Sequence, residues 1–77
     1  MSKYMRLIVM FDLPTGTAGE RRAANQFRHF LLHDGYYMMQ FSIYVRLCNG
    51  QEAATKHRGR LLRELPEEGS VLSLIHI

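Results

Sequence analysis

The sequence has only one cysteine, Cys48, and no long apolar run. A single cysteine excludes an intrachain disulfide and a cysteine-built zinc site, and it suits a reducing cytosol. The run from Leu7 to Phe11 is far shorter than the ~20 residues of a membrane helix, and Asp12 follows it at once. A glycine-rich phosphate loop and a Ser–His–Asp or Cys–His pairing are also missing. These absences predict a cytoplasmic protein without these familiar catalytic motifs.

What is present is a small, basic and fairly apolar chain. Its 77 residues predict one domain over 1–77, and 47% apolar content excludes a disordered tail. A domain this small buries only ~60% of its unfolded surface, so a second subunit is expected. Ten basic residues against seven acidic ones give a net charge of +3. Most of the basic residues are arginine, whose forked guanidinium suits phosphate, so the composition favours nucleic acid as a partner.

The first half of the chain predicts a strand and then a helix. Residues 4–13 alternate between two sides, which is typical of a strand, and Pro14 ends it. Thr17 and Glu20 have the spacing of a capping box, so a helix should run from about 18 to 33 and stop at 34–35. Its apolar stripe is formed by Ala23, Phe27, Phe30 and Leu31.

Residues 36–47 alternate without a break, which is longer than the usual strand of ~5–6 residues. They form either one long bent strand or two short strands that meet near residues 40–42, and the pattern leaves both open. Odd-numbered positions make an unbroken apolar face, which we expect to meet the helices. The even-numbered positions make a mixed, aromatic face that we expect to lie on the other side of the sheet.

The second half predicts a helix and a last strand. Asn49 and Glu52 have cap-like spacing, so a helix should span about 51–64, followed by a turn at 66–69 and a strand over 70–77. The order predicts an α+β sandwich with both helices on one face of a single sheet. The other sheet face is too apolar for solvent, so we expect a symmetric dimer through it. The residues assigned to that interface are Met10, Tyr36, Met38 and Tyr44.

Asp12 is the candidate for chemistry, because it ends the first strand on the face of the expected interface. A two-fold axis would bring two such carboxylates together, and carboxylate oxygens with water suit magnesium. The alternative is that Asp12 only bonds the backbone of the following turn, and the pattern alone slightly favours that alternative. A distributed basic edge suits contacts to a nucleic-acid backbone. Its candidate residues are Arg21, Arg22, Arg28, Arg46 and Arg60.

Three segments carry a resemblance to a known family: 5–14 (MRLIVMFDLP), 35–46 (GYYMMQFSIYVR) and 66–71 (PEEGSV). Their order and spacing resemble the Cas two family of small CRISPR-associated proteins over nearly the whole chain. The resemblance implies a ferredoxin-like antiparallel sandwich that dimerises through its sheet face. It also implies a magnesium-dependent endonuclease, acting on single-stranded RNA or double-stranded DNA, in which Asp12 binds Mg²⁺ or another divalent cation.

The family also implies a role in prokaryotic antiviral defence. Its dimer bridges the larger CRISPR integrase, Cas one, in the complex that captures DNA and inserts it as a new spacer. A non-catalytic DNA-binding scaffold is therefore one alternative to the nuclease, and a generic ferredoxin-like nucleic-acid-binding module is another. Family members continue past the last strand with a segment that crosses to the partner subunit. This sequence stops at residue 77, so we expect that extension to be absent.

Overall fold

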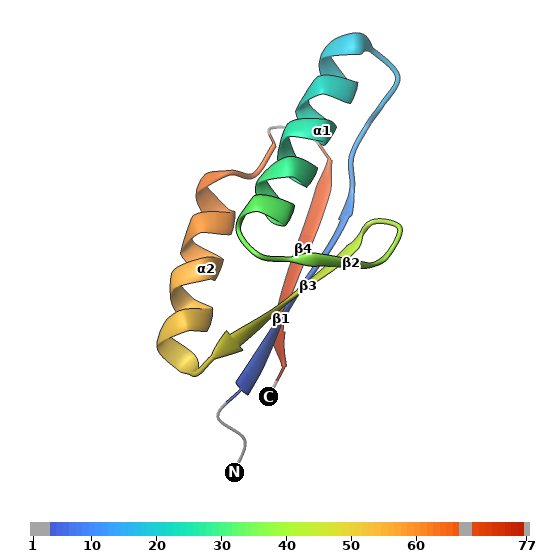
Figure 1. Ribbon diagram of the computed structural model, residues 1–77. Coiled ribbons are helices and arrows are strands. Elements are labelled where there is room, and N and C mark those ends of the chain that lie inside the picture. The colour runs from blue at the N-terminus through green and yellow to red at the C-terminus, as the bar shows by residue number, and fades with distance from the viewer. Residues whose placement is uncertain (1–3, 67–68, 77) are drawn as a thin grey trace.

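The chain folds into one four-stranded antiparallel sheet with two helices on one of its faces (Figure 1). The computed structural model describes residues 4–66 and 69–76, and residues 72–76 by their backbone alone. The elements are β1 (Tyr4–Asp12), α1 (Ala18–His33), β2 (Tyr37–Gln40), β3 (Ile43–Asn49), α2 (Gln51–Arg63) and β4 (Ser70–His76). The sheet order β2-β3-β1-β4 is that of a ferredoxin-like α+β fold, which confirms the predicted fold class.

The cap predicted for the start of α1 is present in the structure, whereas the cap predicted for the start of α2 is not. The Thr17 hydroxyl accepts a hydrogen bond from the Glu20 amide at 3.1 Å, and the Glu20 carboxylate accepts one from the Thr17 amide at 2.9 Å. The capping box of α1 is therefore confirmed. The predicted cap of α2 at Asn49 is wrong, because the N-cap is Gly50, which makes no side-chain cap. Its φ of 97° is one that glycine adopts at little cost.

Residues 36–47 form two strands, which settles the open alternative. β2 and β3 make a hairpin whose two-residue turn is Phe41 and Ser42, and the pairing slips between Met38 and Gln40. Ser42 has a φ of 68°, in the left-handed region that a tight turn requires. The Ser42 carbonyl accepts a hydrogen bond from the Phe11 amide at 3.1 Å, so the turn is tied to the end of β1.

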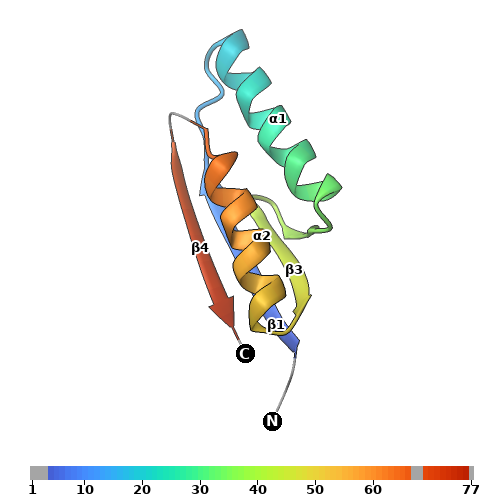
Figure 2. The ribbon, with the colours of Figure 1, turned by 90° about the vertical axis from the view of Figure 1, so that its left-hand side faces the viewer.

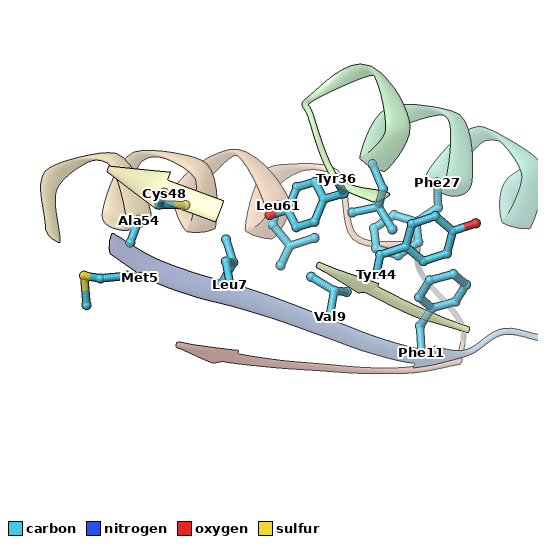
Figure 3. Close-up of a cluster of buried hydrophobic side chains, with 11 residues drawn as sticks. Met5, Leu7, Val9, Phe11, Phe27, Tyr36, Tyr44, Cys48, Ala54 and Leu61 are labelled. Atoms are coloured by element: carbon cyan, nitrogen blue, oxygen red, sulfur yellow. The ribbon is translucent and has the colours of Figure 1, made fainter. Parts of the chain in front are cut away.

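The predicted faces of this hairpin are wrong, and the even-numbered side lies beneath the helices. Tyr36 and Tyr44 are only 3% and 1% exposed, whereas Phe41, expected in the core, is 81% exposed. The Tyr44 ring stacks on Phe11 with centroids 5.5 Å apart, and Figure 3 shows both rings within the core. The odd-numbered set is the more apolar of the two, so hydrophobicity alone indicated the wrong side. Arg46 also lies on the helix side of the sheet, where its guanidinium donates to the backbone carbonyls of Asp34 and Leu47.

This reversal changes the residues available for a dimer interface. Tyr36 and Tyr44 cannot form it, because they are buried against the chain's own helices. Met38 pairs with Tyr44, so it belongs to the helix side as well, at the sheet edge. Met10 does lie on the face without helices, as predicted. The remaining described residues of that face, which we call the open face, include Ile8, Tyr37, Ile43, Val45 and Leu47.

The core fills the space between the sheet and the helices. Leu7 and Val9 project from β1 toward the helices and are fully buried (Figure 3). From above, α1 contributes Phe27 and Leu31, and α2 contributes Leu61. A view turned by 90° shows both helices on the same side of the sheet (Figure 2). Among the described residues, no helix covers the opposite face of the sheet, so that face is available to pack against another sheet.

Candidate active site at the end of the first strand

Asp12 is the last residue of β1, and its side chain is exposed. β1 alternates between a buried and a more exposed side, which places Asp12 on the open face with Met10. It borders an open hollow of about 560 Å³ between the tip of the β2–β3 hairpin and the start of β4. The hollow is also lined by Met10, Phe41, Ser42, Ile43, Ser70 and Val71. One carboxylate at the rim of an accessible hollow can meet a ligand from solvent.

The backbone around Asp12 is held from both flanks. On one side, the preceding residue Phe11 bonds the Ser42 carbonyl. On the other side, Asp12 pairs with Ser70, and Gly69 packs against its main chain. A Cβ on Gly69 would lie 2.8 Å from the Asp12 carbonyl oxygen and 2.7 Å from Leu13 Cδ2. Only glycine fits this approach, so the end of β1 has a fixed place relative to β4.

The arginines predicted to contact nucleic acid separate into two groups. Arg28, on α1, lies against Phe41, one of the residues that line the hollow, because its guanidinium carbon is 6.0 Å from the centre of the Phe41 ring. Arg21 donates to the Thr15 carbonyl at 3.2 Å, in the loop between Asp12 and α1, and Arg22 is exposed on the same helix. These three belong to the helix that follows Asp12, and their contact with nucleic acid remains a prediction.

Arg46 and Arg60 instead surround Asp34, at the end of α1. Arg46 donates through Nε to the Asp34 carbonyl and through Nη1 to the Leu47 carbonyl, each at 2.8 Å. Arg60 donates to Asp34 Oδ1 at 2.8 Å. His57 Nδ1 lies 2.8 Å from Asp34 Oδ2, and a carboxylate oxygen can only accept, so this nitrogen is the donor. The guanidinium groups of Arg46 and Arg60 therefore make hydrogen bonds within the folded chain.

The Asp34 cluster joins the end of α1 to α2 and β3. Burial raises the pKa of Asp34, but the hydrogen bonds from His57 and Arg60 lower it more, so the net pKa lies below 3.8. The carboxylate thus stays charged at neutral pH. The sequence pattern indicates Asp34 only as the end of a helix. His57 and Arg60 stand 23 and 26 residues away, and no local pattern signals that they converge on it.

A hard divalent cation fits the donor chemistry of the Asp12 carboxylate. Mg²⁺ commonly uses one or two carboxylates and completes its shell with water and substrate phosphate oxygens. Within the described part of the chain there is no cluster of three His, Cys, Asp or Glu side chains suited to a metal. The described residues also include no helix able to span a membrane.

The fold and this site define a class: a ferredoxin-like domain with one strand-end carboxylate, an exposed aromatic ring and arginines beside it. The chain belongs to the family described as CRISPR associated protein Cas2, which matches residues 5–76. It is 58% identical over 67 residues to the CRISPR-associated endoribonuclease Cas2 of Acidovorax ebreus, covering 87% of this chain and 66% of that protein.

Two further relatives carry the same name. The protein of Flavobacterium psychrophilum is 49% identical, with 84% of this chain and 56% of the relative aligned. The protein of Streptococcus mutans strain UA159 is 46% identical, with 91% of this chain and 64% of the relative aligned. The chain thus spans between about half and two-thirds of the length of these relatives.

Proposed function

We propose that this chain is the ferredoxin-like part of a CRISPR-associated, metal-dependent endonuclease of the prokaryotic cytoplasm, with Asp12 as its metal-binding and catalytic residue. The observation that supports this most is the exposed Asp12 carboxylate beside an accessible hollow, together with relatives named as endoribonucleases. The reaction is hydrolysis of a phosphodiester bond in RNA or DNA.

Asp12 would hold Mg²⁺ or another divalent cation through its carboxylate oxygens. Such an ion, when bound, activates water and offsets the charge that develops on a phosphodiester. The protein's own contribution is positional, because the Ser42 carbonyl bonds the amide of the neighbouring Phe11 and Gly69 packs against the Asp12 carbonyl. The positive charge of Arg28, which stands over the Phe41 ring at the tip of the hairpin, would attract the phosphates of a strand that enters the hollow.

We also propose that two copies pair through the open face and bring two Asp12 carboxylates toward one axis. The support is that, among the described residues, no helix covers this face (Figure 2), although it presents Leu47 and Tyr37 at 55% and 49% exposure. Apolar patches of this kind mark interfaces. A dimer would also supply a second carboxylate ligand for the metal ion, since each protomer carries one Asp12 at the interface.

Asp12→Asn tests the nuclease directly. The substitution keeps the size of the side chain and removes its charge, so cleavage of single-stranded RNA and of duplex DNA should be lost in Mg²⁺. Calorimetric titration with Mn²⁺ should lose its binding heat in the same variant. Undiminished cleavage by highly purified Asp12→Asn protein would refute the assignment of Asp12.

Leu47→Glu tests the dimer, and Leu62→Glu is its matched control. Both leucines are about half exposed, at 55% and 52%, but Leu62 lies on α2, outside the open face. Sedimentation equilibrium should show a monomer for Leu47→Glu and a dimer for the wild type and Leu62→Glu. Dimers in all three proteins would exclude pairing through the open face.

The second candidate function is a non-catalytic DNA scaffold for the larger CRISPR integrase subunit, Cas one. It is favoured by the small number of metal ligands in the described chain and by the arginines of α1. In that case Arg21→Glu and Arg22→Glu should weaken duplex binding and reduce its salt dependence, while Asp12→Asn still supports spacer integration. Affinity that does not change with salt would exclude phosphate contacts as the mechanism.

A further inference from the structure

Phe41 is a large aromatic side chain that the fold holds out in solvent. Its exposed fraction of 81% is the highest among the exposed large apolar side chains of the described residues. The ring is not on a loose loop. It occupies a two-residue turn in which Ser42 has a φ of 68° and is bonded through its carbonyl to the Phe11 amide. The turn therefore presents the ring at a fixed place beside the end of β1, as Figure 1 shows for the hairpin tip.

The surroundings of Phe41 combine an aromatic face, a positive charge and a carboxylate. The guanidinium of Arg28 stands over the ring at 6.0 Å, and it is held there by its hydrogen bond to Asn25 Oδ1 at 3.0 Å. The cation covers one face of the ring and leaves the rest open to solvent. Phe41 and Asp12 line the same hollow, whose volume of about 560 Å³ is within the range of small-ligand sites.

We propose that Phe41, backed by Arg28, is the base-stacking residue of this site, where it receives an unpaired base of a strand whose backbone passes Asp12. The inference rests on the proposed nuclease function and deepens it. An exposed aromatic ring offers a face for a base, and the adjacent arginine offers charge for the phosphate. This pairing of aromatic face and cation fits a nucleotide better than it fits an apolar protein segment.

Stacking at Phe41 makes the site select unpaired strands. In a duplex each base is already stacked between its neighbours, so a side chain reaches a base face only at the cost of unstacking. In a single strand the base is free to turn onto the ring. Phosphate contacts alone would not favour the single strand, because a duplex carries the higher density of phosphate charge. Phe41 is thus a specificity-determining residue, and Asp12 is the one that acts on the bond.

The first test uses the absence of tryptophan from the chain. Phe41→Trp, made together with Asp12→Asn to prevent cleavage, places the only indole of the protein at the proposed stacking position. A short single-stranded oligoribonucleotide should quench its fluorescence, and a duplex of the same length should not. Leu62→Trp is the control, because this α2 position is 52% exposed and does not line the hollow. Equal quenching at both positions would overturn the proposal.

The second test measures affinity by fluorescence anisotropy, again with Asp12→Asn present. Phe41→Leu keeps an apolar side chain but removes the aromatic face. It should weaken binding of the single strand by about five-fold or more, with duplex binding unchanged, and Phe41→Tyr should restore the wild-type affinity. An unchanged affinity, or the same loss for single strand and duplex, contradicts stacking.

The two proposals can fail separately. If Asp12→Asn leaves cleavage intact, the nuclease assignment falls, while binding to Phe41 is still measurable. If Asp12→Asn abolishes cleavage but Phe41→Leu binds the single strand normally, only the stacking role falls. A change of oligomeric state in Phe41→Leu, measured by sedimentation, would assign the ring to a protein interface and would also refute stacking.

Discussion

The Asp34 cluster should stabilise the fold without taking part in chemistry, and Asp34→Asn tests this. The carboxylate is 9% exposed and accepts hydrogen bonds from His57 and Arg60, both at 2.8 Å. Asparagine has nearly the same shape but no charge. Its amide nitrogen also faces a donor where one carboxylate oxygen stood. The variant therefore loses both charge-assisted hydrogen bonds, which join the end of α1 to α2.

The magnitude follows from the burial of each partner. A hydrogen bond to a charged group contributes about 1.5–3 kcal/mol, and His57 is 11% exposed, so its bond with Asp34 falls in this range. The Arg60 side chain is 42% exposed, so solvent screens its contribution to at most about 1 kcal/mol. We expect the free energy of unfolding to fall by about 2–4 kcal/mol in Asp34→Asn.

The assay is urea unfolding followed by far-ultraviolet circular dichroism, with Asp12→Asn as the matched control. Both substitutions remove one aspartate charge, but Asp12 is exposed whereas Asp34 bridges two helices. The urea midpoint should drop for Asp34→Asn, whereas the free energy of unfolding of Asp12→Asn should stay within about 0.5 kcal/mol of the wild-type value. Equal midpoints in the two variants would refute the reasoning. Nuclease activity should be lost in Asp12→Asn and kept in Asp34→Asn, when it is measured under conditions where Asp34→Asn remains folded.

Three further predictions rest on single features. Because the pKa of Asp34 is lowered below 3.8, its stabilisation is complete above that pH and is lost as pH falls through the folded-state value; acid titration of Asp34→Asn should lack this component of the wild-type loss. Gly59→Ala should raise the free energy of unfolding by about 0.5–1 kcal/mol, because Gly59 lies inside α2 and its Cβ would meet open space; a lower melting temperature would contradict this. The buried Tyr36 hydroxyl has no hydrogen-bond partner among the described residues, and burial raises its pKa, so Tyr36→Phe should be neutral or stabilising by up to about 1 kcal/mol in the same urea assay.

The sequence predicted the local structure well where the signals were local. The capping box at Thr17 and the alternation of β1 depend on residues within a few positions of each other, so α1 and β1 could be located. The position of Asp12 at the end of a strand, on the face of Met10, followed from the same alternation. The placement of both helices on one face of a single sheet followed from the succession of elements, whereas the ferredoxin-like fold was implied by the resemblance to the family.

Only tertiary structure decided which side of the hairpin met the helices. The odd-numbered set of residues 36–47 is more apolar than the even-numbered set, so the free energy of transfer from water indicated the wrong side. The choice was made by the register with β1, which places Tyr44 opposite Val9 and therefore beneath the helices. The same register left Phe41 in solvent. Likewise, Asp34, His57 and Arg60 meet because two helices pack on one sheet face, and contacts between distant residues have no period in the sequence that reveals them.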